Sequence, residues 1–193
     1  KHSGTYESAC AVRQELGKGV EVFDSQFLSW GQGFLALAAA KGAKEGKNLQ
    51  EILWRLEDLR SRTHVIAILD TLVFLKKGGR ADKIIDVLER LTSFLNLKIV
   101  VHFVGGSITP LGRGGARTMQ GALRRVYTHI EELGALEKLA ILHTRSAALA
   151  KDVVEDLKTR IGYKGRPLVQ DTGAVLASHA GPGAIAVVAI TAE

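Results

Sequence analysis

The amino-acid sequence predicts an α/β protein whose sheet is antiparallel or mixed and carries helices on one face. Two observations lead to this fold class. Short apolar segments of strand length alternate with longer segments whose apolar residues recur at helical spacing. Several strand-length segments are separated by short glycine-containing turns, which are typical of antiparallel neighbours. With 193 residues, of which 46% are hydrophobic and 24% charged, the chain is long enough to bury a core.

The first third of the chain is predicted to be mainly helical. Ser3 or Thr5 is expected to cap the first helix, and Gly17 to end it. Asn48 precedes a segment with apolar residues at helical spacing, and asparagine is a preferred residue just before a helix. The patterns predict, in order, a helix over residues 4–16, a strand over 20–23 and helices over 27–43 and 49–62.

The rest of the chain is predicted to contain most of the strands. Gly105-Gly106 and Gly181-Pro182-Gly183 each separate two apolar runs, so each predicts a β-hairpin. The change in character after Arg62 predicts a boundary between a domain of residues 1–62 and a domain of residues 63–193. The expected elements are a strand over 64–69, a helix over 82–91, a hairpin of 97–103 with 107–111, a helix over 116–133, a strand over 138–143, a helix over 146–161 and a hairpin over 175–190.

Composition narrows the classes of function. The net charge of +6 is spread along the chain, and no aromatic-rich RNA-binding motif or zinc finger is present, so a nucleic-acid partner is not expected. The single cysteine, Cys10, excludes an internal disulfide and suits the cytoplasm. The six histidines never stand at a metal-ligand spacing such as HxH or HExxH, so no metal site is expected. Neither a membrane-spanning segment nor a signal peptide is evident.

Small groups of residues suggest a site for an anion. Ser3 and Gly4 would place a hydroxyl and free backbone N–H groups at the start of a helix, although the same residues would serve as an ordinary cap. His179 stands among small side chains just before a turn, which leaves space beside its ring, although a histidine there is more often a packed residue. Arg80 follows Gly78-Gly79, and Arg117 lies at the N-terminus of the predicted helix 116–133. Either arginine could face an anion or simply be a surface arginine.

A serine-dependent hydrolase or acyltransferase is the alternative of a different class. It would use Ser3 or Ser25 as nucleophile with His179 as base, and Asp24 as a possible third member. No GxSxG motif supports it.

Five segments together carry a more specific signal. They are SGTYESA (3–9), VEVFDSQFLSWGQGF (20–34), LDTLVFLKKGGRADK (69–83), SITPLGRGGARTMQGAL (107–123) and TGAVLASHAGPGAIAV (172–187). In this order they resemble the DegV family of bacterial fatty-acid-binding proteins. The resemblance implies a two-domain fold in which an incomplete N-terminal α/β domain precedes a mixed or antiparallel sheet domain with helices. A long-chain fatty acid would lie at the junction between them.

The resemblance also implies roles for individual residues. Ser3, Gly4 and His179 would bind the carboxylate of the fatty acid, and Arg80 and Arg117 would lie near its exposed face. The chain would have no catalytic residue and no cofactor other than its lipid, and would present the carboxylate to a fatty acid kinase that makes an acyl phosphate for phospholipid synthesis. A cytoplasmic location follows, with at most transient membrane contact.

The sequence departs from the family pattern in two places. The family has an upstream segment with a TDS motif and a threonine/serine loop that also touches the carboxylate, so the first domain is expected to be incomplete here. The helix-start motif before Arg117 reads GGAR where the family has a stricter form.

Overall fold

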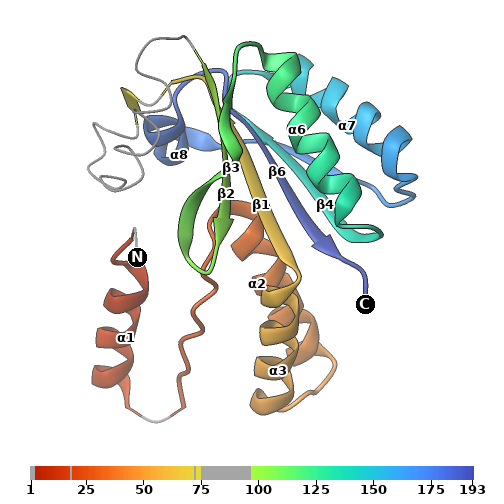
Figure 1. Cartoon of the computed structure of the whole chain (residues 1–193). Coiled ribbons are helices and arrows are strands. Elements are labelled where there is room, and N and C mark those ends of the chain that lie inside the picture. The colour runs from red at the N-terminus through yellow and green to blue at the C-terminus, as the bar shows by residue number, and fades with distance from the viewer. Residues whose placement is uncertain (1–2, 18, 72, 75–96) are drawn as a thin grey trace.

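The structure, a computed structural model, describes residues 3–17, 19–71, 73–74 and 97–193 (Figure 1). The helix predicted over residues 82–91 lies outside them. The elements are α1 (Thr5–Leu16), α2 (Ser29–Lys44), α3 (Leu49–Ser61), β1 (Thr63–Leu69), β2 (Lys98–Val104), β3 (Ser107–Ala116), α6 (Met119–Glu132), β4 (Leu136–His143), α7 (Ala147–Ile161), β5 (Leu168–Asp171), α8 (Gly173–Ala180) and β6 (Ile185–Thr191).

The strands form one six-stranded mixed sheet in the order β3-β2-β1-β6-β4-β5. β4 and β5 are parallel, and every other neighbouring pair is antiparallel. The hairpin predicted around Gly105-Gly106 is confirmed, since β2 and β3 pair directly across that turn. β6, the last strand along the chain, lies between β1 and β4.

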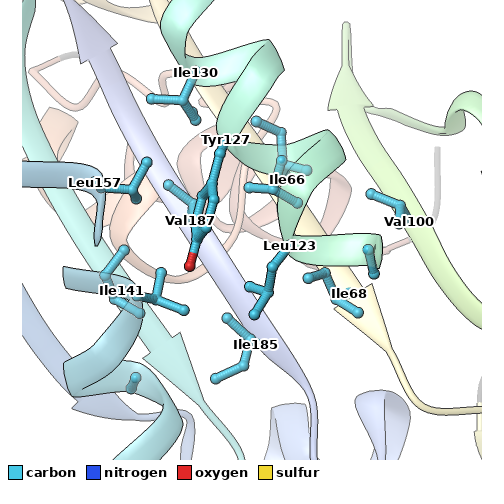
Figure 2. Packing of buried hydrophobic residues seen from close by; sticks show 14 of the residues in the cluster. Ile66, Ile68, Val100, Leu123, Tyr127, Ile130, Ile141, Leu157, Ile185 and Val187 are labelled. Atoms are coloured by element: carbon cyan, nitrogen blue, oxygen red, sulfur yellow. The ribbon is translucent and has the colours of Figure 1, made fainter. Parts of the chain in front are cut away.

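One face of the sheet packs against α6 and α7. Ile66 of β1, Ile141 of β4 and Val187 of β6 point toward this face. There they pack with Tyr127 of α6 and Leu157 of α7 (Figure 2). Tyr127 is only 4% exposed, and its hydroxyl donates a 2.9 Å hydrogen bond to Asp156 of α7. This cluster is the larger core of the molecule.

The opposite face is covered in part by α2 and α3. Val65 and Val188 pack on this face against Phe34 of α2 and Leu59 of α3. Each of these valines is next in sequence to a residue that faces α6. The expectation of helices on one face only is therefore wrong. Strands β1, β4 and β6 read as nearly continuous apolar runs because both of their faces are buried. The core continues across Arg62 and Thr63, and the division into domains at that position stays a prediction.

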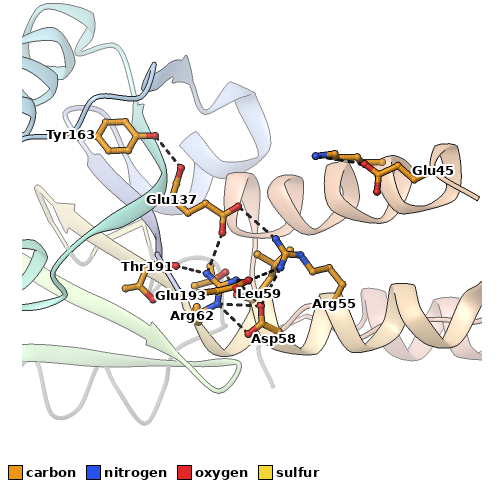
Figure 3. Close-up of polar contacts among 11 residues, drawn as sticks. Glu45, Arg55, Asp58, Leu59, Arg62, Glu137, Tyr163, Thr191 and Glu193 are labelled. Carbon is orange, nitrogen blue, oxygen red and sulfur yellow. Dashed lines mark hydrogen bonds and ion pairs between the residues drawn. The ribbon is translucent and has the colours of Figure 1, made fainter. Parts of the chain in front are cut away.

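α3 is fixed at both ends. Asn48 accepts from the backbone N–H of Glu51, and the Glu51 side chain accepts from that of Asn48, so the predicted cap is confirmed as a capping box. At the other end, the Arg62 guanidinium donates to the Asp58 carboxylate, to Glu137 Oε2 and to the backbone carbonyl of Thr191 (Figure 3). α3 is thus tied to the ends of β4 and β6.

Three local predictions differ from the structure. Residues 20–23 form no strand; Val20 instead accepts a hydrogen bond from the Arg13 side chain of α1. α6 begins at Met119 and not at residue 116, because Ala116 still pairs with Lys98 in the sheet. β5 was not expected, since it is only four residues long and mostly exposed. In the described part of the chain, no helix is both long and apolar enough to cross a membrane.

Candidate fatty-acid head-group site

The turn Gly181-Pro182-Gly183 connects α8 to β6 and needs glycine at both ends. Gly181 has φ +76° and ψ 172°, a conformation that is essentially restricted to glycine. A Cβ atom at Gly181 would lie 2.4 Å from Cδ2 of Phe74. Gly183 has φ +80° and lies beside Asp70, which follows β1. The turn therefore packs closely against the chain that leaves the carboxyl end of β1.

Backbone hydrogen bonds hold this turn to the loop after β4. The Gly183 N–H donates to the carbonyl of Thr144, and the Thr144 N–H donates to the carbonyl of Ala184, both at 3.0 Å. The Thr144 side chain is buried and its hydroxyl lies 3.2 Å from that of Thr172. The start of β6 is thus fixed relative to the carboxyl end of β4.

His179 lies in the last turn of α8. The prediction that residues 175–190 form a β-hairpin is wrong, because residues 173–180 are helical and only 185–191 form a strand. The imidazole is half-buried, whereas Val175 at the start of the helix is 76% exposed. The histidine therefore stands at a helix end next to a turn, and not between two strands.

The residue that follows His179 packs on an apolar cluster. Ala180 packs against a group of buried side chains from β1, β2 and the residue just before β6, which includes Leu69, Ile99 and Ala184. Ala180 and Ala184 flank the glycine-proline-glycine turn. The half-buried imidazole is therefore next in sequence to residues of a hydrophobic surface on the sheet.

Asp171 supports the start of α8. Its carboxylate accepts a 2.9 Å hydrogen bond from the Gly173 N–H and a 3.3 Å bond from the Arg145 N–H. These two hydrogen bonds, with the nearby His143 ring and Arg145 charge, lower the pKa of Asp171 below its ordinary value. The Asp171 carboxylate therefore holds together the loop after β4 and the first residue of α8. Asp171 is not among the site residues predicted from the sequence, although an aspartate directly before Thr-Gly and a helical segment is a recognisable local signal.

Ser3 and Gly4 lie at the start of α1, and both are exposed. Gly4 is the residue before the helix, and no side chain caps it; Thr5 is the first helical residue. Ser3 Oγ lies 2.8 Å from Thr5 Oγ1 and accepts from the Thr5 N–H at 3.2 Å. The expectation that Ser3 or Thr5 caps α1 through its side chain is therefore wrong. The hydroxyls nonetheless gather at a helix N-terminus.

Of the two arginines predicted near the head group, Arg80 and Arg117, the structure describes only Arg117. Arg117 is exposed in the short segment between β3 and α6, just before Thr118, whose hydroxyl accepts from the Gly121 N–H. Arg117 is therefore not part of α6. Arg80 lies outside the described residues.

No polar contact joins Ser3, His179 and Arg117 to one another within the residues that the structure describes. Two clefts of about 390 and about 240 Å³ lie elsewhere, one lined by Arg13 and Glu21 and the other by His64 and His102. The hydrolase alternative gains no support: Ser25 is bonded to the backbone of Phe27, and the Asp24 carboxylate accepts from the Gln26 N–H.

Comparison with known proteins gives a consistent result. Residues 1–192 match the sequence pattern of a family described as uncharacterised proteins of the DegV family. A DegV domain-containing protein of Streptococcus pneumoniae is 30% identical over 187 residues, which cover 96% of this chain and 64% of that protein. The chain therefore spans less than two thirds of the length of this relative.

Solved structures share the fold. DegV of Bacillus subtilis, described as a fatty acid binding protein, superposes with a TM-score of 0.84 at 27% identity over 98% of this chain and 67% of that one. A DegV family protein of Thermus thermophilus, described by its fatty acid binding, has a TM-score of 0.80 at 31% identity, with the same shares covered. The extent of the match and the agreement of the fold lead to one conclusion: this chain belongs to the DegV family.

Proposed function

We propose that this chain binds a long-chain fatty acid and carries it without catalysing a reaction. The observation that carries the proposal is the position of His179, a half-buried imidazole directly followed by Ala180, which packs on the apolar cluster of β1, β2 and β6. A polar group beside an apolar surface suits a ligand with a carboxylate and a hydrocarbon tail. The descriptions of the Bacillus subtilis and Thermus thermophilus relatives as fatty-acid-binding proteins support this assignment.

The energetics of such a ligand divide between its two ends. Burying the tail is favourable by about 0.8 kcal/mol per methylene, so a long chain needs few polar contacts for affinity. The carboxylate must keep hydrogen-bond donors when it leaves water, because an unpaired buried charge is costly. In the proposal, His179, the Ser3 hydroxyl and the N–H of Gly4 supply those donors. The tail lies against the apolar cluster that includes Leu69 and Ile99.

A kinase is the proposed partner. Arg80 and Arg117 would lie near the exposed side of the head group, where a fatty acid kinase phosphorylates the carboxylate to form an acyl phosphate for phospholipid synthesis. Because Arg117 is exposed in the segment before α6, it is accessible to a second protein. The chain spans about 64% of its Streptococcus pneumoniae relative, so the activity of a whole DegV protein is part of this proposal and not a finding.

The test is native mass spectrometry of the purified chain, followed by denaturation and lipid extraction. A discrete adduct that releases a long-chain fatty acid is the expected result. His179→Ala is expected to lower the fraction of lipid-bound protein, whereas Ser178→Ala is the matched control. Ser178 is exposed on the same helix, and its hydroxyl is already bonded to the Val175 carbonyl.

Equal lipid occupancy in His179→Ala and Ser178→Ala would remove His179 from the site. If the protein bears no adduct and takes up no added fatty acid, carriage of a lipid by this chain is overturned. Hydrolysis of generic esters that is lost in Ser3→Ala would instead establish the hydrolase alternative.

A further inference from the structure

Three histidines from separate elements lie close together, and the proposed function gives none of them a role. His64 of β1, His102 of β2 and His129 of α6 place their ligand nitrogen atoms within 4.8 Å of one another. The His64 and His102 rings are stacked with centroids 5.7 Å apart, and the His129 ring approaches His102 edge-on at 5.0 Å. This group is called the histidine cluster below.

The fold explains why distant residues meet. Ile66 of β1 is paired with His102 of β2, and His64 points to the same face as Ile66 because alternate residues of a strand share a face. That face packs against α6, which carries His129 one turn after Arg125 and directly before the buried Ile130. Spacing along the sequence gives no indication of the cluster, since each histidine comes from a different element.

The cluster is remote from the proposed head-group site. His64 lies near the amino end of β1, and Asp70, beside Gly183, follows its carboxyl end. A strand rises about 3.3 Å per residue, which separates the two positions by roughly 20 Å. A ligand of the cluster would therefore not share the binding site proposed for the fatty acid.

The state of the rings suits coordination of a cation. His64, His102 and His129 are each partly buried, so few water molecules compete for their ring nitrogens. Imidazole nitrogen is a common ligand of divalent transition-metal ions.

His129 has a buried ring nitrogen that lacks a hydrogen-bond partner in the part of the chain that the structure describes. Its Nε2 atom is buried and has no hydrogen-bond partner among the described residues. On the other side of the ring, Nδ1 lies 3.9 Å from the Glu132 carboxylate. A metal-bound histidine usually donates the N–H of its second ring nitrogen to a carboxylate, a carbonyl or a water. Glu132 lies near Nδ1, although at a distance longer than a hydrogen bond.

We propose that the histidine cluster binds one divalent transition-metal ion, with Zn²⁺ as the ion that three imidazoles and one open position suit best. Zinc–nitrogen bonds of about 2.0–2.1 Å place tetrahedral ligands about 3.3 Å apart, so modest side-chain rotations would close the site around the ion. The cleft lined by His64 and His102 gives solvent access to the fourth position. The ion would clamp α6 onto the β1–β2 pair.

The test uses the purified chain treated with a chelator and then titrated with Zn²⁺ alone. One equivalent is expected to bind by calorimetry and to raise the melting temperature. His64→Gln and His102→Gln are each expected to weaken Zn²⁺ binding by about tenfold or more. His143→Gln, which removes a histidine at the end of β4 and outside the cluster, is the matched control and is expected to bind Zn²⁺ as the parent does. Glu132→Gln is expected to weaken binding up to about tenfold.

A second measurement needs no variant. Bound Zn²⁺ is expected to protect His64, His102 and His129 from acylation by diethyl pyrocarbonate, while His179 reacts equally with and without the metal. The proposal is overturned if Zn²⁺ does not bind or if binding is unchanged in both His64→Gln and His102→Gln. It is also overturned if the three histidines react with diethyl pyrocarbonate as fast in the presence of Zn²⁺ as in its absence.

Discussion

The Arg62 guanidinium lies 2.6 Å from the Asp58 carboxylate, one helical turn earlier, and this pair joins the end of α3 to the sheet. From the same guanidinium, Nη1 reaches Glu137 Oε2 at 3.2 Å and the carbonyl of Thr191. The Arg62 side chain is 13% exposed, so its charge depends on these partners in place of water. Arg55 and Glu193 extend the network toward solvent (Figure 3).

Replacing Arg62 with glutamine should destabilise the fold. The substitution leaves the Thr191 carbonyl and two carboxylates without their shared donor, and we expect the free energy of unfolding to fall by about 1–2 kcal/mol. Arg55→Gln is the control: its side chain is 45% exposed, and exposed pairs contribute about 0–1 kcal/mol. Urea denaturation of both variants measures the difference, and equal losses would contradict a special role for Arg62.

Stability should also depend on pH through Asp58. Hydrogen bonds from Arg62 hold the pKa of Asp58 below its ordinary value of 3.8, with a smaller effect from the charges of Arg62 and Arg55. A carboxylate whose pKa is lower in the folded state gives stability that is fully present above its unfolded pKa and is lost as pH falls through its folded pKa.

Asp58→Asn therefore offers a direct comparison with the parent chain. The parent should be the more stable protein above about pH 5, and its advantage should shrink below about pH 4. Denaturation series across this range measure the two free energies. An advantage that stays constant down to about pH 2 would show that the charge of Asp58 contributes nothing.

Gly181→Ala should disturb the turn that follows His179. The new Cβ would lie 2.4 Å from Cδ2 of Phe74, and the backbone conformation is costly for alanine by about 1–3 kcal/mol. Gly134→Ala serves as control, because Gly134 also has a positive φ, +79°, but its Cβ would meet open space. We expect a lower melting temperature for Gly181→Ala than for Gly134→Ala; the reverse order would mean that the turn accommodates the methyl group.

Arg117→Ala should separate lipid binding from transfer. Because Arg117 is exposed and bonded to no described residue of the head-group site, fatty-acid occupancy should be unchanged while acyl phosphate formation by a fatty acid kinase decreases. Arg124→Ala, an exposed arginine on α6, is the matched control. Loss of the bound lipid in Arg117→Ala would show instead that this side chain holds the carboxylate directly.

Sequence patterns predicted those elements whose signals are local. The Asn48 cap, the periodic apolar residues of α3 and the Gly105-Gly106 turn each lie within a few residues of the structure that they specify. The segment from Gly173 to Ala180 is a helix where a strand is predicted, because it is short and apolar and periodicity cannot distinguish helix from strand over such a length. The Asp171 carboxylate accepts a hydrogen bond from the Gly173 N–H at the start of this helix, a local contact that apolar periodicity does not reveal.

Features that depend on tertiary pairing could not be predicted in this way. Residues 20–23 have strand-like composition, but a strand forms only where a partner strand offers hydrogen bonds. The meeting of His64, His102 and His129 requires the β1–β2 register and the position of α6 together. Of the candidate site, the sequence indicated His179 and Ser3 by residue type, whereas the surroundings of His179 emerged only from the fold.

The position of β6 has a consequence for biosynthesis. β6 comes after all the other strands along the chain, yet it pairs with both β1 and β4 at the middle of the sheet. We therefore expect β1–β2–β3 and β4–β5 to remain unjoined during translation until residues 185–191 have left the ribosome. Until β6 joins them, the edges of β1 and β4 have no partner strand and can pair with other nascent chains. We expect this protein to need chaperone shielding late in translation, and loss of β6 alone to yield aggregates in place of a smaller folded product.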